Sequence, residues 1–223
     1  MNADERRVLS ILVNTNQTLY AAKKSNNHRI NSFEEIPKNR YNSLYNVSVA
    51  TMEEPLDILR DEIYNMLNFT VEYIDVLSKI EAVNIYDAAE IIVEIGDIKR
   101  FQNKKHFLSY CGLSPVMKKN GKYYKITKNR DYNIVANRKQ DSIDYCENLK
   151  KVLMRCSQKL ITMDPEYKEY YQNYKRQYQL KHMNYSLKRL HLMALKKVTI
   201  KFANLIYKEF KDIAIIEELD END

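Results

Sequence analysis

Glycine is the residue that most constrains how this chain folds, because only three glycines and four prolines occur in 223 residues. A many-stranded sheet needs turn residues at each connection, and a phosphate-binding loop needs closely spaced glycines. A doubly wound dinucleotide fold and a P-loop are therefore excluded, and helices must supply most of the structure. All three glycines, Gly96, Gly112 and Gly121, fall within one window of 26 residues. The sequence predicts a mainly α fold that departs from helix in that window.

Apolar spacing predicts how the helices are distributed. We expect a helix over residues 4–30, a loop over residues 39–47 and a second helix over residues 51–80. The near-heptad rhythm of Ile63, Met66, Ile74 and Leu77 predicts a helical hairpin within the chain or a coiled coil with another subunit. Both arrangements bury the same apolar stripe.

The domain division follows from these segments. We expect a helical hairpin or coiled-coil segment over 1–80, a compact helical domain with a short basic loop or β-ribbon over 81–212, and an acidic tail over 213–223. Gly96 is a predicted left-handed cap after a short apolar helix. Asp164 followed by Pro165 predicts the start of another helix, and the last helix is expected to end near Lys211.

Positive charge is concentrated in one part of the chain. Twelve Lys or Arg residues and a single acid, Asp131, lie between Lys99 and Lys139, so this window carries +11. The remaining 182 residues carry 24 basic and 29 acidic side chains. A basic block inside a slightly acidic protein indicates a polyanion partner.

The sequence gives little support for a metal site or a membrane segment. The four histidines and three cysteines lack metal-ligand spacing, and neither a signal peptide nor a long apolar run is present. We therefore expect no metal site in this chain, no membrane partner and a cytoplasmic location. Five tyrosines from Tyr167 to Tyr178 share one helix face, which favours packing. Stacking on nucleic-acid bases is the alternative role for the exposed ones.

Residues 88–128 contain two motifs that carry a resemblance. The first is Glu94-Ile95-Gly96-Asp97-Ile98, followed by Arg100-Phe101, and the second is Tyr110-Cys111-Gly112-Leu113-Ser114-Pro115. This segment resembles the C-terminal domain of the insertion-sequence transposases that have a DEDD nuclease-like N-terminal domain. These are relatives of the pilin-gene-inverting recombinases and include bridge-RNA-guided members. Asn120-Gly121-Lys122 and Ile126-Thr127-Lys128 are similar to the loop and strand that follow in that family.

The resemblance implies a function in DNA transposition. A complete family member would recombine DNA through a serine, with Mg²⁺ held by the carboxylates of the nuclease-like domain. Asn120 stands at the aligned serine position, and Ser114 is the weak substitute. We therefore expect a truncated DNA-binding portion that is not catalytic alone and has no cofactor in this chain. DNA, a guide RNA, a second copy and a full-length transposase are the implied partners, and a helical dimerisation protein acting on a full-length transposase is the alternative function.

The expected nucleic-acid contacts follow the basic window and the family's glycine–lysine loop. They are Lys99, Arg100, Lys104, Lys105, Lys118, Lys119, Gly121, Lys122, Lys125, Thr127, Lys128 and Arg130. The distant pair Lys196 and Lys197 is expected to lie outside this contact.

Overall fold

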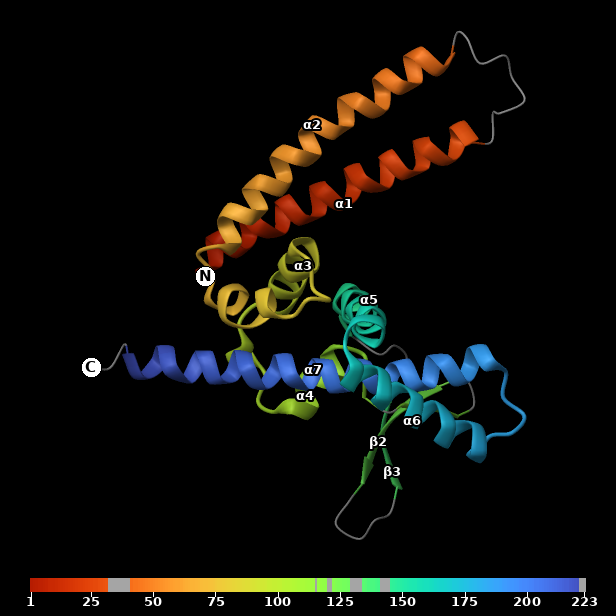
Figure 1. Ribbon diagram of the computed structural model, residues 1–223. Helices are drawn as coiled ribbons and strands as arrows, with labels where there is room; N and C mark the ends of the chain where they lie inside the picture. Colours follow the sequence, from red (N-terminus) through yellow and green to blue (C-terminus); the bar gives the residue numbers. More distant parts are fainter. Residues whose placement is uncertain (32–40, 115, 120–121, 129–133, 141–144, 221–223) are drawn as a thin grey trace. The chain divides into compact units, whose positions relative to one another are not determined.

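The computed structural model describes residues 1–31, 41–114, 116–119, 122–128, 134–140 and 145–220 (Figure 1). The chain forms two compact units. Unit 1 consists of residues 1–79 and 84–93, and unit 2 of residues 80–83 and 94–223. Most described residues are helical, which confirms the mainly α fold class.

Unit 1 is built on a pair of long helices, α1 (Ala3–Asn31) and α2 (Tyr41–Leu67), which lie side by side (Figure 1). Leu9 of α1 and Ile63 and Leu67 of α2 are fully buried, so apolar burial joins the pair. The predicted loop over 39–47 is wrong from Tyr41 onward, because α2 already begins there, whereas residues 39 and 40 lie outside the described residues.

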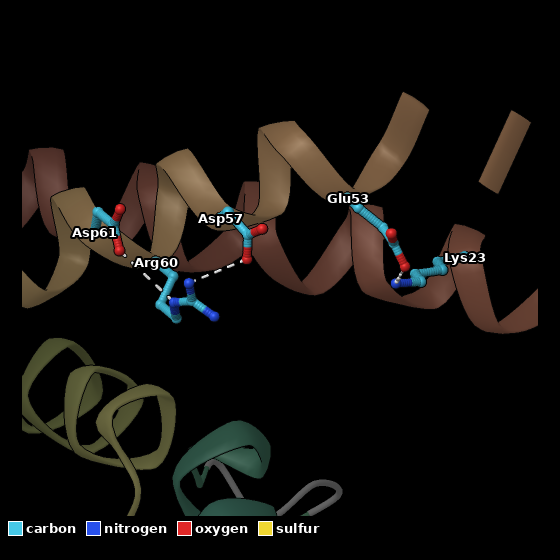
Figure 2. Close-up of polar contacts among 5 residues, drawn as sticks. All are labelled: Lys23, Glu53, Asp57, Arg60 and Asp61. Carbon is cyan, nitrogen blue, oxygen red and sulfur yellow. Dashed lines mark hydrogen bonds and ion pairs between the residues drawn. The ribbon is translucent and has the colours of Figure 1, made fainter. Parts of the chain in front are cut away.

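Ion pairs on the helix surfaces add to this packing. Figure 2 shows Lys23 of α1 facing Glu53 of α2, with Nζ 2.7 Å from Oε1. Within α2, Arg60 lies between Asp57 and Asp61, at 3.1 and 3.7 Å from their Oδ1 atoms. Exposed pairs of this kind contribute little to stability, so apolar burial remains the main contribution.

The second predicted helix is shorter than expected. The α2 helix ends at Leu67 and is followed by a π-helical turn, η1 (Glu72–Val76), and a 3-10 turn, η2 (Leu77–Lys79). The N–H of Thr70 bonds to the carbonyl of Leu67 at 2.9 Å, a tight turn that ends the helix. Ile63 and Leu77 are buried within unit 1. Their burial fits a hairpin within one chain.

Helix α3 (Ile85–Ile95) leads from unit 1 into unit 2. The side chain of Asn84 accepts a hydrogen bond from the N–H of Asp87 at 2.8 Å, which caps its first turn. Ala88, Ala89, Ile91 and Ile92 are buried. Helix α3 ends at Ile95, and Gly96 then adopts a φ of 62°, so the predicted left-handed cap is confirmed.

The helices of unit 2 pack around α7 (Leu187–Asp220), which contacts α4 (Lys104–Tyr110), α5 (Glu147–Met163) and α6 (Pro165–Lys181). Phe107, Leu149, Leu153, Leu195 and Phe202 are fully buried among these helices. The prediction that the last helix ends near Lys211 is wrong. Ala214 is buried, so the apolar face that holds α7 continues past Lys211 and the helix continues with it to Asp220.

A three-stranded antiparallel sheet completes unit 2. Strand β2 (Lys122–Lys128) pairs with β1 (Val116–Lys119) on one side and with β3 (Ile134–Gln140) on the other. We call this sheet the basic ribbon. Of the two predicted forms, a short basic loop or a β-ribbon, the structure has the β-ribbon. None of the helices in the described residues is long and apolar enough to cross a membrane.

Replacing Asp164 tests the predicted start of α6. The side chain of Asp164 accepts from the N–H groups of Glu166 and Tyr167, at 2.8 and 3.3 Å, and Pro165 occupies the first helical turn. We expect Asp164→Ala to lower the free energy of unfolding by about 1 kcal/mol in urea titrations, because both donors lose their acceptor. Asp164→Asn keeps an acceptor oxygen and should match the wild type. Equal stability of all three proteins would contradict a stabilising cap.

Candidate nucleic-acid interface

The first motif forms a sharp turn at the end of α3. Gly96, with its φ of 62°, reverses the chain after Ile95. The side chain of Asp97 then accepts a hydrogen bond from the N–H of Lys99 at 2.8 Å and starts the 3-10 turn η3 (Ile98–Arg100). The glycine supplies the left-handed conformation that other residues rarely adopt, and the aspartate caps the next turn.

Glu94 connects this turn to a segment about fifty residues further along the chain. Its carboxylate accepts from Sγ of Cys146 and from Nδ2 of Asn148, each at 2.9 Å. Its backbone carbonyl accepts from Nη2 of Arg100 and from the hydroxyl of Tyr110, each at 3.1 Å. One residue therefore holds both motifs and the start of α5 together.

The second motif ends helix α4 in a similar way. Gly112 adopts a φ of 65°, and the N–H groups of Leu113 and Ser114 both bond to the carbonyl of Leu108, at 2.9 and 3.2 Å. The N–H of Cys146 donates to the carbonyl of Tyr110 at 2.8 Å. A Cβ atom on Gly112 would lie 2.7 Å from Cδ2 of Tyr145, so the Tyr145 ring lies directly against the glycine.

These contacts join the two segments of chain that flank the basic ribbon. Ser114 precedes β1 and Tyr145 follows β3, and the motif residues bring the two positions together. We call the group of Glu94, Tyr110, Gly112, Tyr145 and Cys146 the ribbon clamp. The motifs singled out in the sequence therefore position the basic ribbon.

The thiol in the ribbon clamp acts as a hydrogen-bond donor. Burial raises the pKa of Cys146, and the hydrogen bond to Glu94 raises it further. Burial likewise raises the pKa of the Tyr110 hydroxyl, whose proton is donated to the Glu94 carbonyl. Both groups thus keep their protons at neutral pH, which suits a structural role better than a nucleophilic one.

Six of the twelve predicted contacts fall on the ribbon. Lys118 and Lys119 lie on β1, and Lys122, Lys125, Thr127 and Lys128 lie on β2. The register sets Lys119 opposite Lys122 and Lys118 opposite Tyr123. Asn120, Gly121 and Arg130 lie outside the described residues, so the expectations for them remain predictions.

The remaining predicted contacts among the described residues lie on η3 and α4, between the two motifs. Lys104 and Lys105 are exposed in the first turn of α4. The Arg100 guanidinium bonds to the Glu94 carbonyl and lies over the rings of Phe101 and Tyr110, with Cζ 4.7 and 4.5 Å from their centroids. Nζ of Lys99 lies 2.8 Å from Oε1 of Glu218, in the acidic last turns of α7. A bound polyanion at Lys99 would compete with that carboxylate.

A second basic region was missed in the sequence. Nine Lys or Arg residues and no Asp or Glu lie between Tyr170 and Lys208, on α6 and α7. This region includes Lys196 and Lys197, which were expected to lie outside the nucleic-acid contact. Burial lowers the pKa of Lys196, and the nearby charges of Lys150 and Lys197 lower it further. The sequence signal for this region is the absence of acidic residues over a long stretch. It is easily missed because Lys and Arg are less frequent there than between Lys99 and Lys139.

The catalytic expectations concern a metal site and Ser114. No set of three or more His, Cys, Asp or Glu side chains is placed among them to hold a metal ion. Ser114 is half-buried at the end of α4, and its N–H bonds to Leu108. Its part as a substitute nucleophile remains a prediction.

The fold and the site define a mainly helical protein whose basic ribbon is fixed at its base by two short motifs. Residues 74–172 match the model of the family described as Transposase IS116/IS110/IS902 family. The match includes both motifs, the ribbon clamp and the basic ribbon, and it ends within α6. No curated protein matches the chain.

Gly112→Ala tests the ribbon clamp. Alanine at either positive-φ glycine costs about 1–2 kcal/mol in backbone strain. At Gly96 the added Cβ meets open space, whereas at Gly112 it meets the Tyr145 ring at 2.7 Å. We expect Gly112→Ala to lower the free energy of unfolding by a further ~1–3 kcal/mol relative to Gly96→Ala.

The two glycine variants are to be compared in the wild-type and Tyr145→Ala backgrounds by urea unfolding. Removing the ring should abolish the difference between them. A difference that persists without Tyr145 would show that the clash is not its cause.

Proposed function

We propose that this chain binds nucleic acid electrostatically through the basic ribbon and acts as the DNA-binding portion of an insertion-sequence transposase. The observation that carries the proposal is the ribbon itself, where five lysines lie on β1 and β2 within the segment that matches the transposase family model. Lysines neutralise the phosphates of a nucleic-acid backbone, and two antiparallel strands such as β1 and β2 can enter the DNA major groove.

The register of the ribbon supports a polyanionic ligand. Lys119 and Lys122 are paired directly across the strands. The register thus brings two lysine positions together on neighbouring strands, and a concentration of positive charge favours a polyanion. Lys104 and Lys105, exposed beside the ribbon clamp, would extend the contact.

We further propose that the chain alone does not cut DNA. The family resemblance places the Mg²⁺ carboxylates in a separate nuclease-like domain, and the aligned serine position holds Asn120, whose amide cannot act as the nucleophile. A guide RNA and a full-length transposase are proposed partners on the same resemblance.

The salt dependence of duplex binding tests the ribbon. Each lysine that neutralises a phosphate contributes about 0.9 to the slope of log K against log salt. Changing Lys122, Lys125 and Lys128 together to Ala should therefore flatten the slope by up to about 3. Fluorescence anisotropy of a labelled duplex at several salt concentrations gives the slope directly.

The control is a triple variant with the same charge change, Lys79→Ala with Lys151→Ala and Lys208→Ala. Each of these lysines pairs with an acid four residues away in the chain: Asp75, Glu147 and Asp212. This control should keep the wild-type slope. If both triple variants flatten the slope equally, the chain binds through its net charge alone and the ribbon is not the site.

A plasmid assay tests the absence of catalysis. Supercoiled plasmid incubated with the chain and Mg²⁺ should remain uncut, because neither the carboxylates nor the serine of the family are provided. Metal-dependent nicking that disappears in Ser114→Ala would contradict the proposal and assign the nucleophile to Ser114.

Exposed apolar side chains in unit 1 favour a second candidate function, as a helical interaction protein. Ile58, Phe69 and Ile74 are 62%, 86% and 46% exposed, respectively. A dimer or a complex with a transposase would bury them. Sedimentation at concentrations on the order of tens of micromolar should detect such a dimer, and Ile58→Ser with Ile74→Ser should weaken it. A strictly monomeric wild-type chain would exclude self-association.

A further inference from the structure

A ladder of aromatic rings runs along one face of α6 and past its end. Tyr170, Tyr174 and Tyr178 follow at intervals of four residues, with centroid separations of 4.9 and 6.0 Å. The His182 ring continues the series 6.4 Å from Tyr178, and Tyr185 stacks on His182 at 4.5 Å with planes 5° apart. All five rings are only half-buried. We call these five residues the aromatic ladder.

The spacing along the ladder is uneven. His182 and Tyr185 are closely stacked, whereas the Tyr174–Tyr178 and Tyr178–His182 pairs are tilted by 37° and 31°. The centroids of these two pairs lie 6.0 and 6.4 Å apart, so Tyr174, Tyr178 and His182 form the loosely packed part of the ladder.

Helix α7 places cations against the same rings. Nζ of Lys201 lies 4.9 Å from the Tyr170 ring and Nζ of Lys197 lies 5.5 Å from the Tyr174 ring. Cζ of Arg189 lies 3.8 Å from the Tyr185 ring. Positions 189, 197 and 201 share one face of a helix. The cations therefore follow the ladder along most of its length.

The charge around the ladder continues to the base of the basic ribbon. Lys150 and Lys197 are the like-charged neighbours that lower the pKa of Lys196. Nζ of Lys150 in turn lies 4.7 Å from the Tyr145 ring, which lies against Gly112 in the ribbon clamp. Basic and aromatic groups thus connect the ribbon clamp with the turn between α6 and α7.

Packing between α6 and α7 explains only part of this arrangement. Tyr167 is buried and makes the contact expected of a packing residue. Packing alone requires neither half-exposed rings further along the helix nor the absence of every acid from Tyr170 to Lys208. Alternating rings and cations without acids are the features of surfaces that hold a single strand, with bases on the rings and phosphates on the cations.

We propose that the aromatic ladder binds single-stranded nucleic acid. Bases stack on Tyr174, Tyr178 and His182, and Arg189, Lys196 and Lys197 neutralise the phosphates. The site accommodates about four nucleotides and reads no sequence, because every base offers a flat face. The inference rests on the proposed nucleic-acid function and adds a second site, separate from the ribbon, for an unpaired strand.

The test measures oligonucleotide binding by the full chain after two tyrosine rings of the ladder are removed or retained. The probes are labelled oligonucleotides of twelve thymidines and of twelve uridines, which distinguish a DNA from an RNA strand. Tyr174→Leu with Tyr178→Leu should weaken their binding about 10-fold or more, whereas Tyr174→Phe with Tyr178→Phe should stay near the wild type. The chain has 18 tyrosines and no tryptophan, so quenching of tyrosine emission gives a second readout of stacking.

Charge reversal supplies a second variant in case the leucine protein does not fold. Arg189→Glu with Lys197→Glu should abolish single-strand binding, whereas the control Lys151→Glu with Lys208→Glu should weaken it only slightly. Unchanged oligonucleotide binding in the ladder variants overturns the proposal, as does equal loss in the phenylalanine and leucine proteins, or binding to neither oligonucleotide.

The two proposals fail in distinguishable ways. The ladder variants should retain duplex binding, and the triple ribbon variant should retain most single-strand binding. If only the ribbon variant loses single-strand binding, the ladder proposal is wrong and the proposed function stands. Failure of the wild-type chain to bind duplex or single strands contradicts both.

Discussion

The carboxylate and carbonyl of Glu94 form the junction on which unit 2 depends. Four hydrogen bonds meet at this residue, from Cys146, Asn148, Arg100 and Tyr110. They close a long loop of chain, and closing a loop costs conformational entropy that the bonds at its base must offset. Burial of Cys111, Leu113 and Leu149 next to these bonds supplies apolar stabilisation. The contacts thus join the chain before β1 to the chain after β3.

Two basic surfaces meet at this junction. The basic ribbon begins and ends at the ribbon clamp, and Lys150, whose ammonium lies over the Tyr145 ring, leads from the clamp toward Lys196 and the aromatic ladder. Under the two proposals, the ribbon would meet a duplex through its lysines, and the ladder would hold an unpaired strand through its rings.

Local signals in the sequence predicted much of the fold. The scarcity of glycine predicted the helical fold class. Gly96 marked the end of α3, and Asp164 followed by Pro165 marked the start of α6. Helix ends set by tertiary burial were missed: Ala214 extends α7, and tight bonds at Thr70 end α2 before the apolar rhythm does. The motif residues were noticed, but their structural role was not, because Glu94 and Cys146 are far apart in the chain and only the folded structure brings them together. The second basic region was overlooked because its signal is an absence of acids.

Hydrogen exchange measured with and without a short DNA duplex tests the central claim most directly, since it locates contact on the chain itself. The claim is that the basic ribbon, fixed by the ribbon clamp, is the surface that meets duplex DNA. We predict slower exchange of the backbone amides in β1, β2 and β3 when duplex is bound, with α1 and α2 unchanged. Slowing confined to unit 1, or spread evenly over the chain without an excess in the ribbon, would contradict the account.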